Sequence, residues 1–62
     1  MVEENIVLEA GRYFVYKAAN SYDVMRNVNT HSEVESMYAK SEDGKSLAIA
    51  RAMYFGDREA CQ

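Results

Sequence analysis

Hydrophobic and polar positions alternate over short distances in the first third of the chain, a pattern typical of β-strands. Residues 5–19 contain two runs rich in β-branched and aromatic side chains, and Ala10-Gly11 separates them. Glycine can supply the positive φ that a tight turn requires. In the second run apolar side chains fall at odd and even positions alike, so both faces of that strand are partly apolar. The segment is therefore predicted to form a β-hairpin whose second strand is covered on both sides.

The middle of the chain fits two patterns. Over residues 22–28 the apolar positions suit either one face of a third strand or a helical stripe. Several weak helix formers follow, which favours a strand that ends in a loop near residues 29–32. Over residues 33–40 strand-like alternation again competes with helical spacing, here preceded by a capping box. The sequence leaves the choice between strand and helix open for this stretch.

Residues 42–55 carry the clearest helical pattern. Ser41 is suited to cap the helix, acidic residues occupy the first turn, and strong helix formers follow. Gly56 is predicted to end the helix. A hairpin turning at Asp43-Gly44 is the alternative, and the alanine content beyond it favours the helix. Bulky apolar residues surround much of the predicted helix, which leaves mainly these for solvent: Lys45, Ser46, Ala48 and Arg51.

These elements predict an α+β fold, in which a small antiparallel sheet of three to four strands, beginning with the N-terminal β-hairpin, is packed by one C-terminal helix. With 62 residues, 1–62 is expected to be a single small domain. A chain of this size hides only about 60% of the surface that its unfolded form exposes. A single cysteine provides no internal disulfide. Self-association or docking on a partner is therefore expected to add stability.

Residues that could carry catalytic chemistry are few. The chain has one histidine, His31, and one cysteine, Cys61. Metal sites need several ligands at set spacings, and nucleophilic catalysis needs a nucleophile, a base and an orienting group. The Gly44-Lys45-Ser46 triplet lacks the upstream glycine of a phosphate-binding loop. We therefore expect no catalytic residues, no metal site and no cofactor, and we expect that the protein is not an enzyme.

Charge and hydropathy indicate the cellular location and exclude some classes of partner. The net charge is −3, and the lysines and arginines are scattered without forming a stripe, so nucleic acid is not expected as a direct ligand. Glu3 and Glu4 lie where a signal peptide carries positive charge. No apolar run approaches the ~18 residues that a membrane span requires. These features predict a cytoplasmic protein without a membrane partner.

The aromatic residues are the best candidates for a binding role, because five tyrosines and two phenylalanines exceed what so small a core is expected to hide. Tyrosine combines a large apolar body with a polar tip and is enriched at interface hot spots. Phe14 and Phe55 are expected in the core. The expected partner-binding residues are Tyr13, Tyr16, Tyr22, Glu33 and Glu35. For the three tyrosines, packing in the core is the alternative.

The wide apolar surface of the predicted helix suggests that two chains associate through it. The expected self-association residues are Leu47, Ile49, Met53 and Tyr54. Arg51 is placed to reach an acidic group on the opposite chain of a two-fold dimer. The alternative is that the same surface is kept for a different protein.

Residues 38–41, leading into an acidic helix start, resemble the strand-to-helix step of many small α+β proteins, including small phage proteins that inhibit host enzymes. The leading interpretation is a small acidic interaction module, phage- or mobile-element-encoded, that binds a host enzyme or complex and blocks its activity by surface occupation. The alternative is a small dimeric nucleic-acid-binding transcriptional regulator, in which the strand over residues 12–17 pairs across a two-fold axis, as in ribbon–helix–helix proteins. Whether the acidic segments mimic nucleic-acid phosphates stays open.

Overall fold

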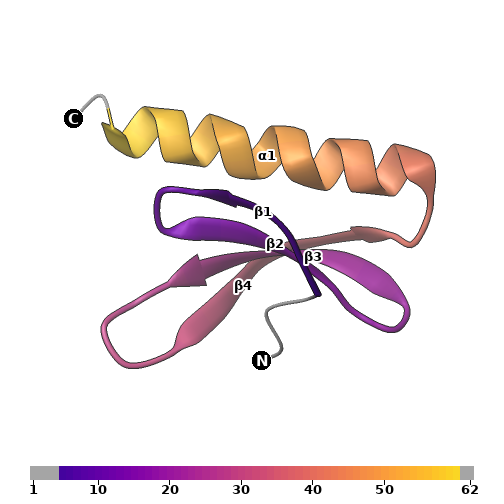
Figure 1. Ribbon diagram of the computed structural model, residues 1–62, viewed down its shortest axis with the longest axis horizontal. Coiled ribbons are helices and arrows are strands. Elements are labelled where there is room, and N and C mark those ends of the chain that lie inside the picture. The colour runs from indigo at the N-terminus through magenta and orange to yellow at the C-terminus, as the bar shows by residue number, and fades with distance from the viewer. Residues whose placement is uncertain (1–4, 61–62) are drawn as a thin grey trace.

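The computed structural model describes residues 5–60 and contains four strands followed by one helix (Figure 1). The elements are β1 (Ile6–Ala10), β2 (Tyr13–Lys17), β3 (Ser21–Asn27), β4 (Ser32–Ala39) and α1 (Glu42–Ala60). Adjacent strands are antiparallel and lie in the order β1-β2-β3-β4, which is a simple meander. The predicted α+β fold is confirmed, and residues 33–40 are largely strand. Glu3, Glu4 and Cys61, considered above, lie outside the described residues.

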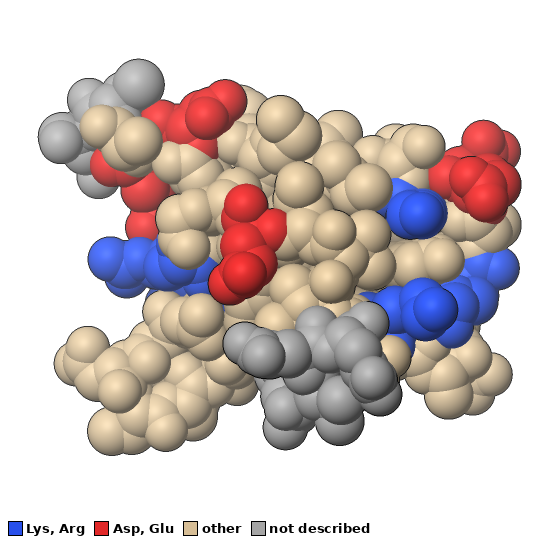
Figure 2. All heavy atoms as spheres, viewed as in Figure 1, with Lys and Arg blue, Asp and Glu red and all other residues tan. Residues whose placement is uncertain are grey.

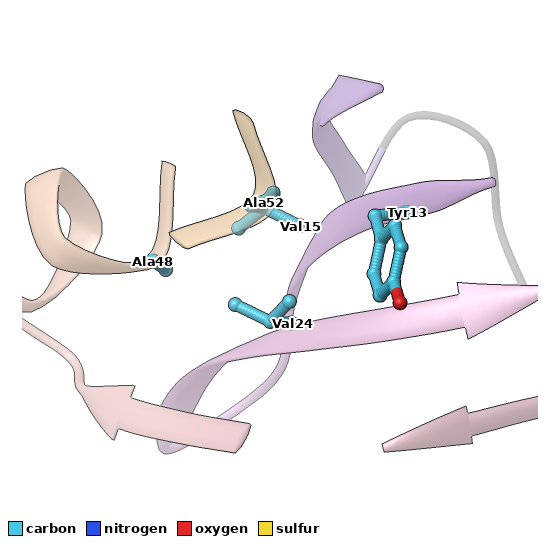
Figure 3. Close-up of a cluster of buried hydrophobic side chains, with 5 residues drawn as sticks. All are labelled: Tyr13, Val15, Val24, Ala48 and Ala52. Atoms are coloured by element: carbon cyan, nitrogen blue, oxygen red, sulfur yellow. The ribbon is translucent and has the colours of Figure 1, made fainter. Parts of the chain in front are cut away.

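The strand registers assign side chains to the two faces of the sheet. Val15 lies opposite Val24, and both point toward α1, which crosses one face of the sheet (Figures 1 and 3). Their neighbours Phe14 and Met25 also lie opposite one another, and they point to the other face. We call this second face, away from α1, the open face. Gly11 has a φ of 63° in the β1–β2 turn, in agreement with the predicted hairpin.

The core lies between the sheet and α1. Its buried side chains are Tyr13, Val15, Val24, Ala48 and Ala52 (Figure 3). The ring of Tyr13 stacks on that of Phe55, with centroids 5.1 Å apart and planes 19° apart. Because α1 contributes only alanines to the buried cluster, most of the buried apolar volume comes from the sheet.

A stripe of small residues lets α1 approach the sheet closely. Gly44, Ala48, Ala52 and Gly56 recur every four positions, so they lie along one face of the helix. A β-carbon at position 56 would lie 2.8 Å from both the β-carbon and the carbonyl oxygen of Ala10. The helix could not take this position with larger side chains along the stripe.

Two expectations about α1 were wrong, and the small-residue stripe explains both. The helix does not end at Gly56 but continues to Ala60. Gly56 lies within the last turns of the helix, because it packs there against the β1–β2 hairpin. Ala48 was expected to face solvent and is fully buried. Conversely, the bulky apolar residues on the flanks of the helix are exposed, namely Leu47, Met53 and Tyr54.

Polar contacts fix the two ends of α1. The Gly44 backbone N–H donates to the hydroxyl oxygen of Ser41 over 3.1 Å, which confirms Ser41 as the N-cap. Near the other end, Arg12 Nε and Glu59 Oε1 form an ion pair of 2.8 Å between the β1–β2 turn and the helix. The helix is therefore attached to the end of β4 at its start and to the first hairpin at its end.

Candidate functional site

The open face carries apolar side chains from all four strands, with Asp23 among them. One row of cross-strand neighbours consists of Phe14, Met25 and Val34, on β2, β3 and β4. A second row consists of Ile6, Tyr16, Asp23 and Met37, one from each strand. Phe14 and Met25 are buried, whereas Val34 is 53% and Met37 62% exposed. The part of this surface on β4 is therefore the part that can meet another molecule.

A β-bulge in β4 places Val34 and Met37 on the same face, although one position is even and the other odd. Val24 lies opposite Ser36 and Met25 opposite Val34, so Glu35 is the extra residue. The Glu35 carboxylate points toward α1, where its Oε1 lies 3.5 Å from Nε of Arg51. The bulge thus gathers the two exposed apolar side chains on one side of β4 and turns a carboxylate to the other.

A second candidate surface is a groove between β4 and α1. Its lining residues are Tyr38, Leu47, Ala50, Arg51 and Tyr54. Leu47 and Tyr54 are 58% and 54% exposed, so one wall of the groove is largely apolar. The Arg51 guanidinium lies over the Phe55 ring at 4.9 Å, which positions its charge beside the groove. A separate pocket is lined by Arg26, Glu33, Val34 and Glu35.

The predicted partner-binding residues do not form one surface. Tyr13 is 5% exposed and lies under α1, so it is core and not surface. Tyr22 is half-buried on the α1 side, with Lys40 Nζ 5.4 Å from its ring centroid. Tyr16 is half-buried on the open face, while Glu33 and Glu35 are exposed on β4. The alternation of β2 separates Tyr13 from Tyr16 because successive side chains point to opposite faces.

Val34 and Met37 were missed among the candidate residues. The signal for them was present, since both are large apolar residues in a stretch with strand-like alternation. Without the bulge at Glu35, however, the alternation would place them on opposite faces. The exposed pair becomes recognisable only when the register is known.

The predicted self-association residues fall on two flanks of α1. At about 100° per residue, Leu47 and Tyr54 lie on nearly the same side of the helix. That side is the one beside β4, since both residues line the groove. Met53 and Ile49 lie on the other flank, and Ile49 packs partly against the core. One dimer contact on a single flank therefore uses only half of the predicted set.

The structure also bears on the strand pairing of the nucleic-acid alternative. β2 lies between β1 and β3, so both of its edges are already paired and it cannot pair with a second copy. Figure 2 shows acidic and basic side chains close together on the face in view, with no continuous basic band. The predicted pairing of this strand with a second copy was therefore wrong, because both edges of β2 are already paired.

Between residues 5 and 60 there is no group of three or more His, Cys, Asp or Glu side chains that could hold a metal ion. No helix in that range is both long and apolar enough to cross a membrane. No family model matches the chain, and neither a curated protein nor a solved structure matches it. The two surfaces are therefore interpreted from their own geometry.

Proposed function

We propose that this protein is a small acidic interaction module that binds a host enzyme or complex and inhibits or modulates it by occupying a surface. The observation that carries the proposal is the exposure of Val34 and Met37 at the edge of the apolar open face. Contiguous apolar surface on a small protein marks an interaction site. Methionine is well suited to such a surface, because its flexible thioether adapts to irregular partners.

Acidic groups around the open face indicate the chemistry of the partner. Glu9 lies opposite Phe14 and is exposed, and Asp23 lies between Tyr16 and Met37 in the second row. The Asp23 carboxylate accepts a hydrogen bond of 2.7 Å from the Ser21 hydroxyl, which holds it in place. A partner surface with an apolar centre and basic groups around it is complementary to this arrangement.

We further propose that the partner is a bacterial protein and that the chain acts in the cytoplasm as a product of a phage or mobile element. The acidic character and the strand-to-helix step at residues 38–41, which resembles that of small phage inhibitors, support this setting. Surface occupation needs no catalytic group in the inhibitor. It requires only that the open face cover a functional surface of the partner.

The test is affinity capture from bacterial lysate with the immobilised protein, followed by mass spectrometry. The wild-type protein should retain a stoichiometric protein partner at about micromolar concentration. Met37→Lys should lose that partner, because it places a charge in the apolar contact. Met53→Lys is the matched control, since Met53 is a similarly exposed methionine on α1 and should leave capture unchanged. Capture of no stoichiometric partner, or equal capture by both variants, would contradict the proposal.

A further inference from the structure

The outer edge of β4 and the neighbouring flank of α1 lie beside one another, and residues of both elements line one groove. β4 is the last strand of the sheet, so within the described part of the chain its outer edge has no strand partner. α1 presents Leu47 and Tyr54 beside this edge. A groove between an edge strand and a helix binds an extended segment through backbone hydrogen bonds, and alternate side chains of that segment enter the groove.

We propose that the occupant is β4 of a second copy, so that two sheets join edge to edge around a two-fold axis between Glu35 and Ser36. Because of the bulge, the order in which side chains point to the open face or to the α1 side is the same in both directions along β4. The side chains that point to the open face are those of Ser32, Val34, Met37 and Ala39. Those that point to the α1 side belong to Glu33, Glu35, Ser36 and Tyr38. Opposite residues of an antiparallel pair must share a face, and about this axis every pair does.

The charges of β4 and α1 also fit a second copy. About the proposed axis Val34 lies opposite Met37 of the second copy, and Glu33 lies opposite Tyr38, so no carboxylate directly faces another. Arg51 and Glu35 each lie near the middle of their elements and are 3.5 Å apart within one chain. The axis brings them together with the same pair from the second copy, in an alternating arrangement of opposite charges.

The apolar groups around the edge are the ones that a monomer leaves uncovered. In the dimer, Leu47 and Tyr54 of one α1 face those of the other, and Ala50 between them allows the helices to approach closely. Joining the sheets also brings the exposed side chains of Val34 and Met37 into contact with their counterparts. For so short a chain, this burial supplies the additional stabilisation that its small core lacks.

Sedimentation equilibrium tests the dimer directly. At about 100 µM the protein should have twice the 7.1 kDa mass of the chain, and the mass of a single chain would overturn the proposal. Leu47→Glu should raise the dimer dissociation constant at least about tenfold. Met53→Glu, on the other flank of α1, should leave it unchanged. A dimer that is weakened by Met53→Glu and not by Leu47→Glu would overturn the proposal, because its interface would lie on the wrong flank.

The register is tested by disulfide formation in a Cys61→Ser background. Val34→Cys and Met37→Cys are prepared separately and oxidised alone or as an equimolar mixture. A disulfide needs β-carbons about 3.5–4.5 Å apart. Only the mixture should give covalent dimers, since position 34 faces position 37 of the second copy, and like positions are offset by about 10 Å along the strand. Cross-linking of either variant alone, or none in the mixture, would overturn the proposed register.

A charge exchange tests the arrangement of charges around the axis, and the free energy of unfolding of each variant, measured alongside, reveals any effect on the pair within one chain. Arg51→Glu places only carboxylates around the axis and should weaken the dimer at least about tenfold. Combining it with Glu35→Arg restores the alternation and should return the dissociation constant to within about threefold of the wild-type value. Failure of the double variant to recover would contradict the axis. Val34 and Met37 lie beside this edge and also belong to the open face. The oligomeric state is measured on the protein alone, so its outcome does not depend on whether a host partner is captured.

Discussion

Gly44 packs directly against Ala39, so that a β-carbon at position 44 would overlap the Ala39 carbonyl oxygen. The last residue of β4 and the first turn of α1 are therefore interlocked. The Ser41 backbone N–H also donates to the Ala39 carbonyl over 2.9 Å, which closes the short connection between the two elements. The direction in which α1 crosses the sheet is set at this contact.

The first prediction concerns Gly44→Ala. Alanine is favoured over glycine in a helix by about 1 kcal/mol, so propensity alone predicts a more stable protein. The clash with the Ala39 backbone should instead lower the free energy of unfolding by about 1–3 kcal/mol, measured by urea denaturation. Ser46→Ala, at an exposed position of the same helix, should be neutral or slightly stabilising. Equal stability of Gly44→Ala and the wild-type protein would show that the Ala39 backbone can move enough to accommodate a β-carbon at position 44.

The second prediction concerns the helix cap. Ser41→Ala removes the acceptor for the Gly44 N–H and should lower the free energy of unfolding by about 1 kcal/mol. Ser41→Asp keeps an acceptor and adds negative charge at the helix N-terminus, so it should be as stable as the wild-type protein. Thermal denaturation of the three proteins distinguishes these outcomes. If Ser41→Asp is as unstable as Ser41→Ala, the cap contributes nothing.

The third prediction concerns the small-residue stripe. Ala52→Leu would be favourable if α1 had room for larger side chains, because it adds apolar volume to the core. Since Ala52 is fully buried against the sheet, the substitution should cost about 1–3 kcal/mol. Met53→Ala removes an exposed side chain and should change the free energy of unfolding by less than about 0.5 kcal/mol. A stabilising effect of Ala52→Leu would contradict the close packing of α1.

The fourth prediction concerns the ion pair between Arg12 and Glu59. The Arg12 side chain is 57% exposed, so the pair is largely solvated despite its 2.8 Å distance. Arg12→Ala should therefore lower the free energy of unfolding by less than about 1 kcal/mol. The difference from the wild-type protein should shrink further in about 1 M salt, where the Debye length is about 3 Å. A loss that is larger and independent of salt would mean that Arg12 acts through packing.

The first hairpin and the start of α1 could be predicted because their signals are local. Gly11 adopts the positive φ that its position between two strand-like runs requires. Ser41 caps the helix because its hydroxyl is next to the first turn in sequence. Such features depend on a few adjacent residues, and the sequence contains them in full.

The nature of residues 33–40 could not be predicted, and the bulge at Glu35 gives the reason. In a regular strand, residues on one face are two apart, whereas residues on one side of a helix are three or four apart. The bulge brings Val34 and Met37 to the same face at a helix-like spacing. The pattern therefore looked helical for a reason that only the pairing with β3 explains.

The buried side of α1 could not be predicted because, in a sequence, large apolar side chains are the usual signal of burial. The helix instead buries its smallest residues, and Leu47 and Tyr54 lie on a flank beside β4. Close approach of a helix to a sheet is a property of two surfaces, so it cannot be recognised in the helix alone. For the same reason Gly56, which in sequence resembles a helix stop signal, is a packing position against Ala10.

The meander also determines the order in which the chain can fold during synthesis. Every strand pairs with its neighbour in sequence, so each hairpin can form as soon as it has emerged. α1 is the last described element, and its contact between Gly56 and Ala10 joins the last turns of the helix to the first strand. Until the middle of α1 is made, the side of the sheet carrying Val15 and Val24 stays uncovered, since Ala48 and Ala52 pack there. Folding of this sheet and helix is therefore completed only after the last turns of α1 have left the ribosome.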